Sequence, residues 1–336
     1  MSKNVRAVFI IAEAGVNHNG RLDLALRLCD AAKEAGVDAV KFQTWITEDL
    51  LTENTDLAEY QKAGLESESS QYEMLKKLEL SHDIFRKIKA YCEKIGIPFL
   101  STPDEPRSLD FLLSIGMGVI KVGSGEVTNI PYLRYIGSKN RDVILSTGMS
   151  SLGEVERAYN ELLSAGSKSV ALLHCTTNYP CPMDEVNLNA MITMKNAFNT
   201  KVGYSDHTMG IEIPIAAVAM GAEIIEKHFT LDRNMEGPDH KASLDTVDLC
   251  KMVSCIRNIE QALGDGIKKP NESEILNKKI VQKSIVAKRN ISKGELFSAE
   301  NMTTKRANGG IPAQFWDAVI GRYSDKNYNH DDLIDL

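Results

Sequence analysis

The chain has 336 residues, 43% of them hydrophobic and 25% charged, and its 39 Lys and Arg against 46 Asp and Glu give a formal net charge of −7. This is an ordinary globular composition, long enough for a barrel of ~250 residues with a small extra domain. A mildly acidic chain with 6% aromatic residues lacks the basic surplus and the stacking rings of nucleic-acid-binding proteins, so we expect no nucleic-acid partner.

Hydropathy and cysteine use indicate where the protein works. No apolar run approaches the 18 residues that a membrane span needs, and the chain runs from Met1 into an apolar strand without a signal peptide. We therefore expect a cytoplasmic protein without a membrane partner. The six cysteines are scattered with no CxxC pair, which indicates reduced thiols; among them Cys175 is the best placed for catalysis.

Short aliphatic and β-branched runs alternate with longer stretches of helical periodicity, which is typical of βα units around a parallel sheet. Eight strands are predicted, at 8–12, 39–43, 98–101, 119–122, 143–146, 170–174, 202–204 and 223–227. Amphipathic helices are predicted between them, including 22–35, 72–95, 152–165 and 211–220. Eight such units in about 230 residues favour a (β/α)8 TIM barrel over a doubly wound sheet.

The last part of the chain changes character. A polar loop, 230–245, precedes a helix pattern that ends near Leu263, and short strands and turns dominate from about residue 281. We therefore predict a barrel domain at 1–264, a linker at 265–280 and a β-rich domain at 281–336. Because about 55 residues bury little apolar surface, we expect this small domain to dock on another surface.

Polar side chains cluster at the predicted carboxyl ends of the strands, where barrels build their active sites. They are Glu13, Lys41, Gln43, Thr102, Lys121, Ser124, Glu126, Ser146, Ser205, His207 and His228. Residues two apart point to the same side of a strand, so Lys41 and Gln43, like Ser205 and His207, are expected to face the barrel mouth together.

Lys41 and Lys121 each emerge from an apolar β run, and burying them requires an anionic partner. Hydroxyl groups accompany them, at Thr102, Ser124, Ser146 and Ser205. This combination predicts a pocket for a compact phosphorylated anion. The alternative is a Schiff-base lysine, as in barrel aldolases, which needs a depressed pKa in an apolar pocket; the hydroxyl groups disfavour it.

His207 and His228 end consecutive strands, which lie about 5 Å apart, so their imidazoles could share a divalent cation with open positions for water and substrate. Glu13 could complete the shell, and Asp206 could support His207 from behind. Asp239 lies in the long loop after strand eight and could bind substrate hydroxyls. The alternatives are hydrogen-bonded structural histidines and a solvated turn.

Nine short motifs in chain order resemble those of the sialic acid synthase family. They are 12–20 (AEAGVNHNG), 40–44 (VKFQT), 101–103 (STP), 123–126 (GSGE), 145–149 (LSTGM), 173–177 (LHCTT), 205–207 (SDH), 226–230 (EKHFT) and 237–239 (GPD). The C-terminal part, with 293–295 (KGE) and 305–306 (KR), resembles that family's antifreeze-like (SAF) domain.

The resemblance implies an activity. Members of this family join phosphoenolpyruvate to an N-acylated mannosamine-type sugar and release phosphate by C–O cleavage. They use a divalent metal, often Mn²⁺, with Mg²⁺ or Co²⁺ as alternatives, and work as homodimers in which each antifreeze-like domain reaches the partner's barrel. For this chain the implied sugar is N-acetylmannosamine, giving a sialic acid, or alternatively 2,4-diacetamido-2,4,6-trideoxymannose, giving legionaminic acid.

The resemblance also implies roles for individual residues. Phosphoenolpyruvate would contact Lys41, Thr102, Lys121, Ser124, Ser146, Thr177 and Ser205. The sugar would contact Gln43, Glu126, Tyr179, Asp239 and, through its N-acyl group, Arg306 of the partner subunit. His207 and His228 would hold the metal. Glu13 or Glu126 would handle the proton, and the two lysines would act electrostatically.

Three departures from the family's common pattern bear on the choice of sugar, one of them the stretch 176–179 (TTNY) in the sugar-side loop. Asp104 and Glu105 follow Pro103, where many members have an aromatic residue. The five residues after Arg306 read Ala-Asn-Gly-Gly-Ile rather than the more usual Pro-Gly-x-Gly-Ile.

A third hypothesis, besides the synthase and the Schiff-base aldolase, is a non-catalytic sugar-binding protein. It fits poorly with so complete a set of lysines, hydroxyls and histidines.

Overall fold

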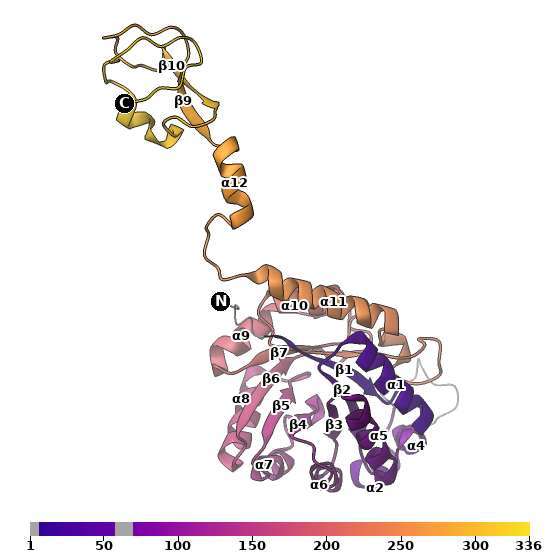
Figure 1. Ribbon diagram of the computed structural model, residues 1–336. Coiled ribbons are helices and arrows are strands. Elements are labelled where there is room, and N and C mark those ends of the chain that lie inside the picture. The colour runs from indigo at the N-terminus through magenta and orange to yellow at the C-terminus, as the bar shows by residue number, and fades with distance from the viewer. Residues whose placement is uncertain (1–6, 58–69) are drawn as a thin grey trace. The chain divides into compact units, whose positions relative to one another are not determined.

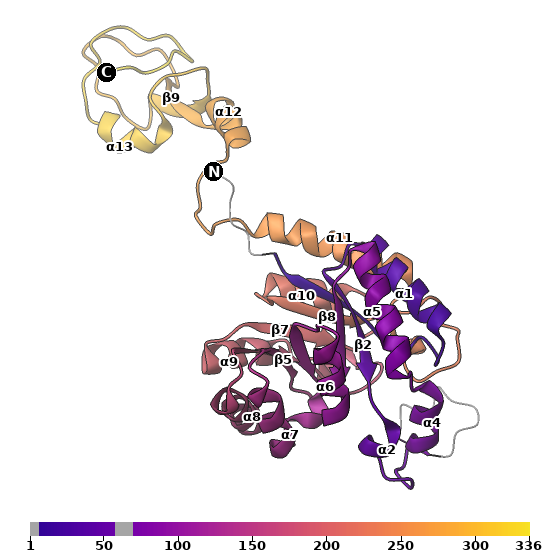
Figure 2. The ribbon, with the colours of Figure 1, turned by 60° about the horizontal axis from the view of Figure 1, so that its bottom comes forward.

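The computed structural model describes residues 7–57 and 70–336. The chain forms two compact units, Met1–Gly264 and Asp265–Leu336, and each is described separately below. In the first unit, helices surround a closed set of strands (Figures 1 and 2).

The first unit is built on eight parallel strands in the order β3-β2-β1-β8-β7-β6-β5-β4, and contact between the outer strands β3 and β4 closes the barrel. The strands are β1 (Phe9–Gly15), β2 (Ala39–Thr44), β3 (Phe99–Pro103), β4 (Val119–Val122), β5 (Asp142–Ser146), β6 (Ser169–His174), β7 (Val202–Asp206) and β8 (Ile224–His228). The helices are α1 (Leu22–Ala35), α2 (Thr47–Leu50), α4 (Gln71–Leu78), α5 (His82–Ile95), α6 (Pro106–Ser114), α7 (Ile130–Ser138), α8 (Leu152–Ala165), α9 (Asn189–Phe198), α10 (Glu212–Ala219) and α11 (Thr246–Leu263). The predicted (β/α)8 barrel is confirmed.

One predicted helix is wrong. The stretch 72–95 forms two helices, α4 and α5, because Ser81 starts a new helix: its side chain accepts the Ile84 N–H as an N-cap. The strand ends also differ from the prediction. β7 continues to Asp206 and β8 to His228, because pairing with the neighbouring strands continues to that point.

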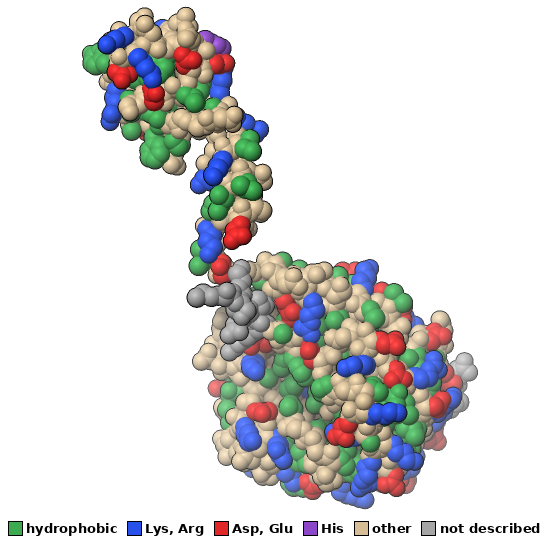
Figure 3. Space-filling model, in the orientation of Figure 1, with side chains coloured by type: hydrophobic (Ala, Val, Ile, Leu, Met, Phe, Trp, Pro, Cys, Tyr) green, Lys and Arg blue, Asp and Glu red, His purple; other side chains and the backbone are tan. Residues whose placement is uncertain are grey.

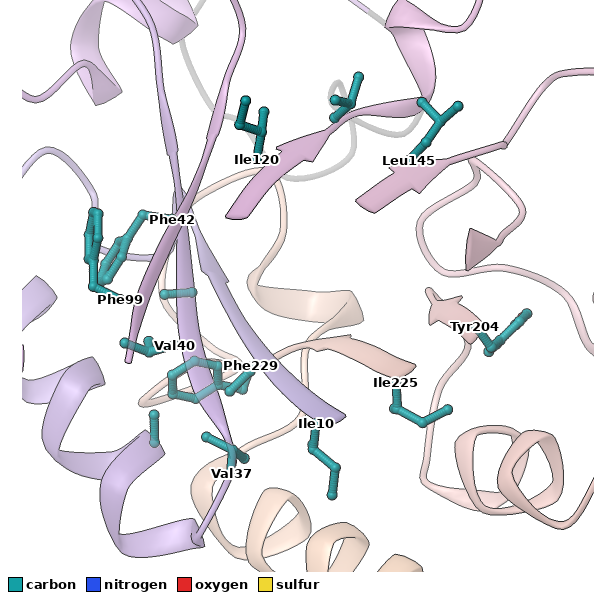
Figure 4. Close-up of a cluster of buried hydrophobic side chains, with 14 of the residues drawn as sticks. Ile10, Val37, Val40, Phe42, Phe99, Ile120, Leu145, Tyr204, Ile225 and Phe229 are labelled. Carbon is teal, nitrogen blue, oxygen red and sulfur yellow. The ribbon is translucent and has the colours of Figure 1, made fainter. Parts of the chain in front are cut away.

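The main core lies between the strands and the helices that cover them (Figure 4). Alternate strand residues such as Ile10, Val40 and Ile225 point outward into it and are wholly buried. Phe42 and Phe99, from neighbouring strands, stack with their ring centroids 6.0 Å apart. Burial of each such side chain stabilises the fold by about 1.5–3 kcal/mol, which fixes the strands that carry the site.

The inside of the barrel has two chemically different layers. The lower layer is apolar and consists of Ile11, Ala39, Leu100, Ile144, Ala171, Leu173 and Ile224. Two residues further along these and the remaining strands stand Glu13, Lys41, Thr102, Lys121, Ser146, Cys175, Ser205 and Glu226. Because side chains alternate along a strand, this upper layer points inward as well. The apolar layer is therefore the floor of a polar pocket.

The second unit is small. It contains α12 (Glu272–Val281), β9 (Lys283–Ala287), β10 (Met302–Arg306) and α13 (Trp316–Val319), with β9 and β10 antiparallel. Its own core includes Ile285, Phe297 and Tyr328. The segment 265–280, which we expected as a linker, carries most of α12, and this helix is exposed along its length.

Surface charge is mixed in sign. On the face of the first unit shown in Figure 3, acidic and basic side chains are interspersed rather than gathered by sign. Within the described residues, no helix is both long enough and apolar enough to cross a membrane.

The close approach of β7 and β8 makes a prediction about stability. A Cβ on Gly203 would lie 2.2 Å from the Ile224 carbonyl oxygen and 2.8 Å from Leu173 Cδ2. We expect Gly203→Ala to lower the free energy of unfolding by about 2–3 kcal/mol, through overpacking. The control is Gly153→Ala in α8, where a Cβ would meet nothing within 4 Å; it should be neutral or stabilise slightly. Equal denaturation midpoints for the two variants would contradict this packing.

Candidate active site

A pocket of about 220 Å³ opens at the carboxyl ends of the barrel strands. It brings together nearly all the site residues predicted for the barrel: Glu13, Lys41, Gln43, Thr102, Lys121, Ser124, Glu126, Ser146, Thr177, Tyr179, Ser205, His207 and His228. Asp239 lines an adjoining lobe. Arg306 lies in the second unit, exposed at the end of β10.

Glu226 also lines the pocket and was missed by our sequence analysis. The sequence pattern could have revealed this residue, because it stands two residues before His228 on β8 and therefore faces the same way. Asp104 lines the pocket too, although we had expected it only to alter the wall near the sugar.

The two lysines are buried against carboxylates. Lys41 Nζ lies 2.5 Å from Glu13 Oε2 and 3.8 Å from Glu226 Oε2, and Lys121 Nζ lies 3.3 Å from Glu226 Oε1. All four side chains are at most 6% exposed. Glu226 therefore links the two ammonium groups, and none of these buried charges is left without an opposite charge.

Three of the four members of this network, the two lysines and Glu226, also contact a hydroxyl group. Lys41 donates to Thr102 Oγ1 at 2.9 Å, and Lys121 donates to Ser146 Oγ at 2.9 Å. Ser205 Oγ donates to Glu226 Oε1 at 3.0 Å. Of the four hydroxyls predicted to accompany the lysines, Thr102 and Ser146 thus contact them directly, and the ammonium groups keep further donor capacity for an anion.

Burial and neighbouring charges set the protonation states. Burial acts to raise the pKa of Glu226, but the Lys121 and Lys41 ammonium groups outweigh it and hold this pKa well below its usual range. Burial raises the pKa of Glu13, with Lys41 opposing. Burial lowers the pKa of Lys121, whereas the Glu13 and Glu226 carboxylates overcome the burial of Lys41 and raise its pKa. The pair Lys41 and Glu226 is therefore ionised.

The two predicted metal ligands stand side by side. The ring centroids of His207 and His228 are 5.6 Å apart, and the Tyr179 ring lies 4.1 Å from that of His207. His207 Nδ1 donates to the Thr176 carbonyl at 2.6 Å, which leaves Nε2 as the free lone pair. Burial lowers the pKa of both imidazoles, and in His228 the neighbouring His207 lowers it further. Both rings are thus neutral, as a metal ligand must be.

The expectation that Asp206 supports His207 by direct contact with its ring is wrong. Asp206 points away from the pocket and pairs with Lys227, while His207 takes its support from the Thr176 carbonyl. The reason is the strand alternation: a residue next to His207 on β7 faces the opposite side of the sheet.

Glu13 and His228 converge on Gly15. A Cβ at Gly15 would lie 3.3 Å from both Glu13 Oε1 and His228 Cε1, and the backbone there has a φ of +51°. Both observations favour glycine, because a side chain would crowd the two groups. Glu13 is also the strand neighbour of both Lys41 and His228. Its carboxylate therefore lies between the lysine network and the histidine pair.

The strand-six loop adds a hydroxyl and a thiol. Thr177 Oγ1 is buried with no hydrogen-bond partner among the described residues, which leaves it available to a ligand. A Cβ on Gly148 would lie 2.1 Å from it. Cys175 Sγ lies 3.2 Å from Ser124 Oγ, and burial raises the pKa of this thiol. Cys175 is therefore a wall of the pocket rather than a nucleophile.

A second lobe of about 190 Å³ adjoins the pocket and shares Gln43, Asp104, Tyr179 and His228 with it. Its remaining walls are largely apolar: Val16, Trp45, Met74, Leu75 and Pro238, with Asp239 as the polar exception. Glu126 lies across the pocket on a 3₁₀ turn, Ser124–Glu126, where it accepts the Asn129 side-chain N–H at 2.6 Å. The site therefore has a cationic side, a histidine side and a lobe with an apolar wall.

Comparison with known proteins agrees with this geometry. The model of the NeuB family matches residues 28–268, and that of the SAF domain matches residues 282–334. The chain belongs to the NeuB family. It is 49% identical to N,N'-diacetyllegionaminic acid synthase of Campylobacter jejuni (98% of this chain, 99% of that protein) and 34% identical to human N-acetylneuraminate-9-phosphate synthase (97% and 91%). The crystal structure of N-acetylneuraminic acid synthetase from Leptospira borgpetersenii, in complex with citrate, superposes with a TM-score of 0.73 at 36% identity (84% and 96%).

Members of the NeuB family generally depend on a metal ion, and the residues present suit one. Among the described residues no three His, Cys, Asp or Glu side chains form a metal cluster, so the protein would supply two imidazoles. His228 Nδ1 and Glu13 Oε1 are buried without hydrogen-bond partners among the described residues, and a cation beside them would satisfy both. Two ligands leave open positions for water and substrate.

Asp104 makes a prediction about pH. Burial, with Glu126 adding to it, raises the pKa of Asp104 from 3.8 to about 7. The folded protein keeps this proton after the unfolded chain has lost it, so stability falls as pH rises from about 4 to 7. We expect Asp104→Asn to raise the melting temperature by a few degrees at pH 8 and hardly at all at pH 4.5, by differential scanning fluorimetry.

Asp110→Asn provides a control of opposite sign. Hydrogen bonds from Lys139 and Tyr135 lower the pKa of Asp110 against the effect of its burial, so this variant should be slightly less stable at pH 8. The same gain for Asp104→Asn at both pH values would show that its carboxyl is not protonated in the folded state.

Proposed function

We propose that the protein condenses phosphoenolpyruvate with an N-acylated mannosamine-type sugar, forming a nonulosonic acid and releasing phosphate by C–O cleavage. The observation that carries the proposal is the joint placement, in one pocket, of two buried lysines with their hydroxyl partners and a pair of neutral imidazoles. The first group suits a compact phosphorylated anion and the second a divalent cation. Membership of the NeuB family supports the same reaction.

Phosphoenolpyruvate would bind on the cationic side of the pocket. Lys41 and Lys121 would neutralise its phosphate and carboxylate, assisted by the hydroxyls of Thr102, Ser124, Ser146, Thr177 and Ser205. The lysines would then stabilise the charge that grows on the departing phosphate, which is an electrostatic contribution made without covalent chemistry. Glu226, by linking the two ammonium groups, would hold them at a fixed spacing before the substrate arrives.

His207 and His228 would hold the metal, for which we propose Mn²⁺. Bound there, it would act as a Lewis acid toward the carbonyl oxygen of the open-chain sugar. Either Glu13, beside His228, or Glu126, across the pocket, would take or return a proton during attack of water on C2 of phosphoenolpyruvate. Gln43, Tyr179 and Asp239 would orient the sugar in and beside the lobe.

The sugar is either N-acetylmannosamine or 2,4-diacetamido-2,4,6-trideoxymannose. Two observations favour the second. The chain is more similar to the legionaminic acid synthase than to the human enzyme, at 49% against 34% identity. The lobe is also walled by Val16, Trp45, Met74 and Leu75, which suit a deoxy carbon and an acetyl methyl better than a hydroxymethyl group.

Phosphate release tests the proposal. Purified protein would be incubated with phosphoenolpyruvate, Mn²⁺ and each sugar in turn, and free phosphate measured with and without EDTA. We expect EDTA-sensitive release with at least one sugar and the higher kcat/KM with the diacetamido sugar. No metal-dependent release with any sugar would refute the synthase. Trapping of pyruvate on Lys121 or Lys41 by borohydride would instead support the Schiff-base alternative.

Arg306 would complete the site from the other subunit of a homodimer. Mixing two impaired variants, and measuring activity at a sugar concentration well below the raised KM, tests this arrangement. Arg306→Ala should raise the sugar KM and spare the KM for phosphoenolpyruvate, and His207→Ala should abolish turnover. When subunits exchange between these variants, mixed dimers form. In them the barrel of the Arg306→Ala subunit, which keeps His207, receives Arg306 of the partner subunit. In a random mixture about half of the dimers contain one subunit of each variant, and one of the two sites in such a dimer is complete. We therefore expect about a quarter of wild-type activity. No recovery would mean that each Arg306 serves its own barrel.

A further inference from the structure

Two buried charged side chains lie outside the pocket, on the strands that carry the two histidines. Asp206 on β7 and Lys227 on β8 are both 0% exposed, and their side chains pair at 2.5 Å. They stand opposite each other as the last backbone partners of the two strands. Because side chains alternate, the residues on either side of each point into the barrel.

A closed set of hydrogen bonds surrounds this ion pair. Lys227 Nζ donates to Asp206 Oδ2 and to the Thr208 carbonyl oxygen, both at 2.5 Å. Thr208 in turn donates its backbone N–H to Asp206 Oδ1 at 3.1 Å and its hydroxyl to Oδ2 at 3.0 Å. The Lys227 ammonium group thereby connects Asp206 and Thr208, in the segment 206–208 at the end of β7, to the neighbouring strand β8.

The middle residue of this segment is His207. Backbone pairing between β7 and β8 ends at Asp206 and Lys227, so His207 lies just beyond it. Lys227 contacts the residues immediately before and after His207 and so continues the link between the strands past that point. The hydrogen bonds of His207 itself go to the strand-six loop, through Thr176 and Cys181. Lys227 is therefore a direct hydrogen-bonded link between the segment that carries His207 and the strand that ends in His228.

Stability alone gives little reason for a buried ion pair here. Apolar residues of similar volume in place of such a pair are often neutral or stabilising, because desolvating two charges offsets most of their attraction. A fully hydrogen-bonded ion pair is directional, because its atoms must meet at fixed distances and angles, whereas apolar packing is not.

We propose that Lys227 and Asp206 are positioning residues that set the spacing of His207 and His228, and with it the affinity of the metal site. The inference rests on the proposed function, which assigns these two histidines to the metal. In this inference, Lys227 and Asp206 contact neither metal nor substrate.

The test is Mn²⁺ binding to the metal-free full chain, measured by calorimetry beside the melting temperature. We expect Lys227→Met to weaken Mn²⁺ binding about 10–100-fold, as loss of groups that orient metal ligands does. Turnover should recover when the Mn²⁺ concentration is raised by the same factor. The double variant Asp206→Asn with Lys227→Met leaves no unpaired buried charge and should fold even if the single variant does not; it should show the same loss.

Arg257→Met is the matched control. Arg257 pairs with Asp38 at 2.7 Å and donates to the Val8 carbonyl at 2.9 Å, near the amino-terminal ends of β1 and β2 and so at the opposite end of the barrel. The Arg257→Met variant should have a lower melting temperature than wild type and an unchanged dissociation constant for Mn²⁺.

Two results would count against the inference, and they are distinguishable. If both Lys227 variants bind Mn²⁺ within twofold of wild type, the ion pair only fills the core and the inference is overturned alone. If the wild-type chain binds no Mn²⁺, the proposed metal site itself is refuted, and the inference falls with it.

Discussion

The buried charge network at the barrel mouth is the constraint on which the site depends. Two lysines cannot be held in a barrel interior without an anionic partner. The Glu226 carboxylate lies between them, and the Glu13 carboxyl group contacts Lys41. The same carboxylates fix where the ammonium groups stand, and Glu13 also reaches the histidine side beside Gly15. A chain with a net charge of −7 thereby holds two ammonium groups close together in one pocket, where a phosphorylated anion would bind.

Much of this site could be predicted because the barrel interior follows a period of two. Most strands change from an apolar to a polar inward residue over two positions, as from Ile11 to Glu13 or Ala39 to Lys41. Strand-end polarity was therefore enough to collect the lysines, hydroxyls and histidines. The same rule, applied to His228, would have found Glu226; we read only the histidine of that strand.

What the sequence could not settle depends on contacts between elements. A single periodic stretch does not show that Ser81 caps a new helix rather than continuing the old one. Adjacency in sequence suggested that Asp206 serves His207, whereas the strand pairing sends it to Lys227. The raised pKa of Asp104 depends in part on Glu126, which is distant in the sequence, so no local pattern encodes it. Arg306 lies in the second unit, so the period-two pattern of the barrel strands carries no information about it.

The account's central claim is that one pocket binds phosphoenolpyruvate and a divalent cation through separate groups of residues. A crystal structure with Mn²⁺ and phosphoenolpyruvate tests it most directly. We predict the phosphate and carboxylate of phosphoenolpyruvate on Lys41 and Lys121, and Mn²⁺ bound to His207 and His228. Phosphoenolpyruvate bound away from the two lysines, or Mn²⁺ bound at other residues, would contradict the account.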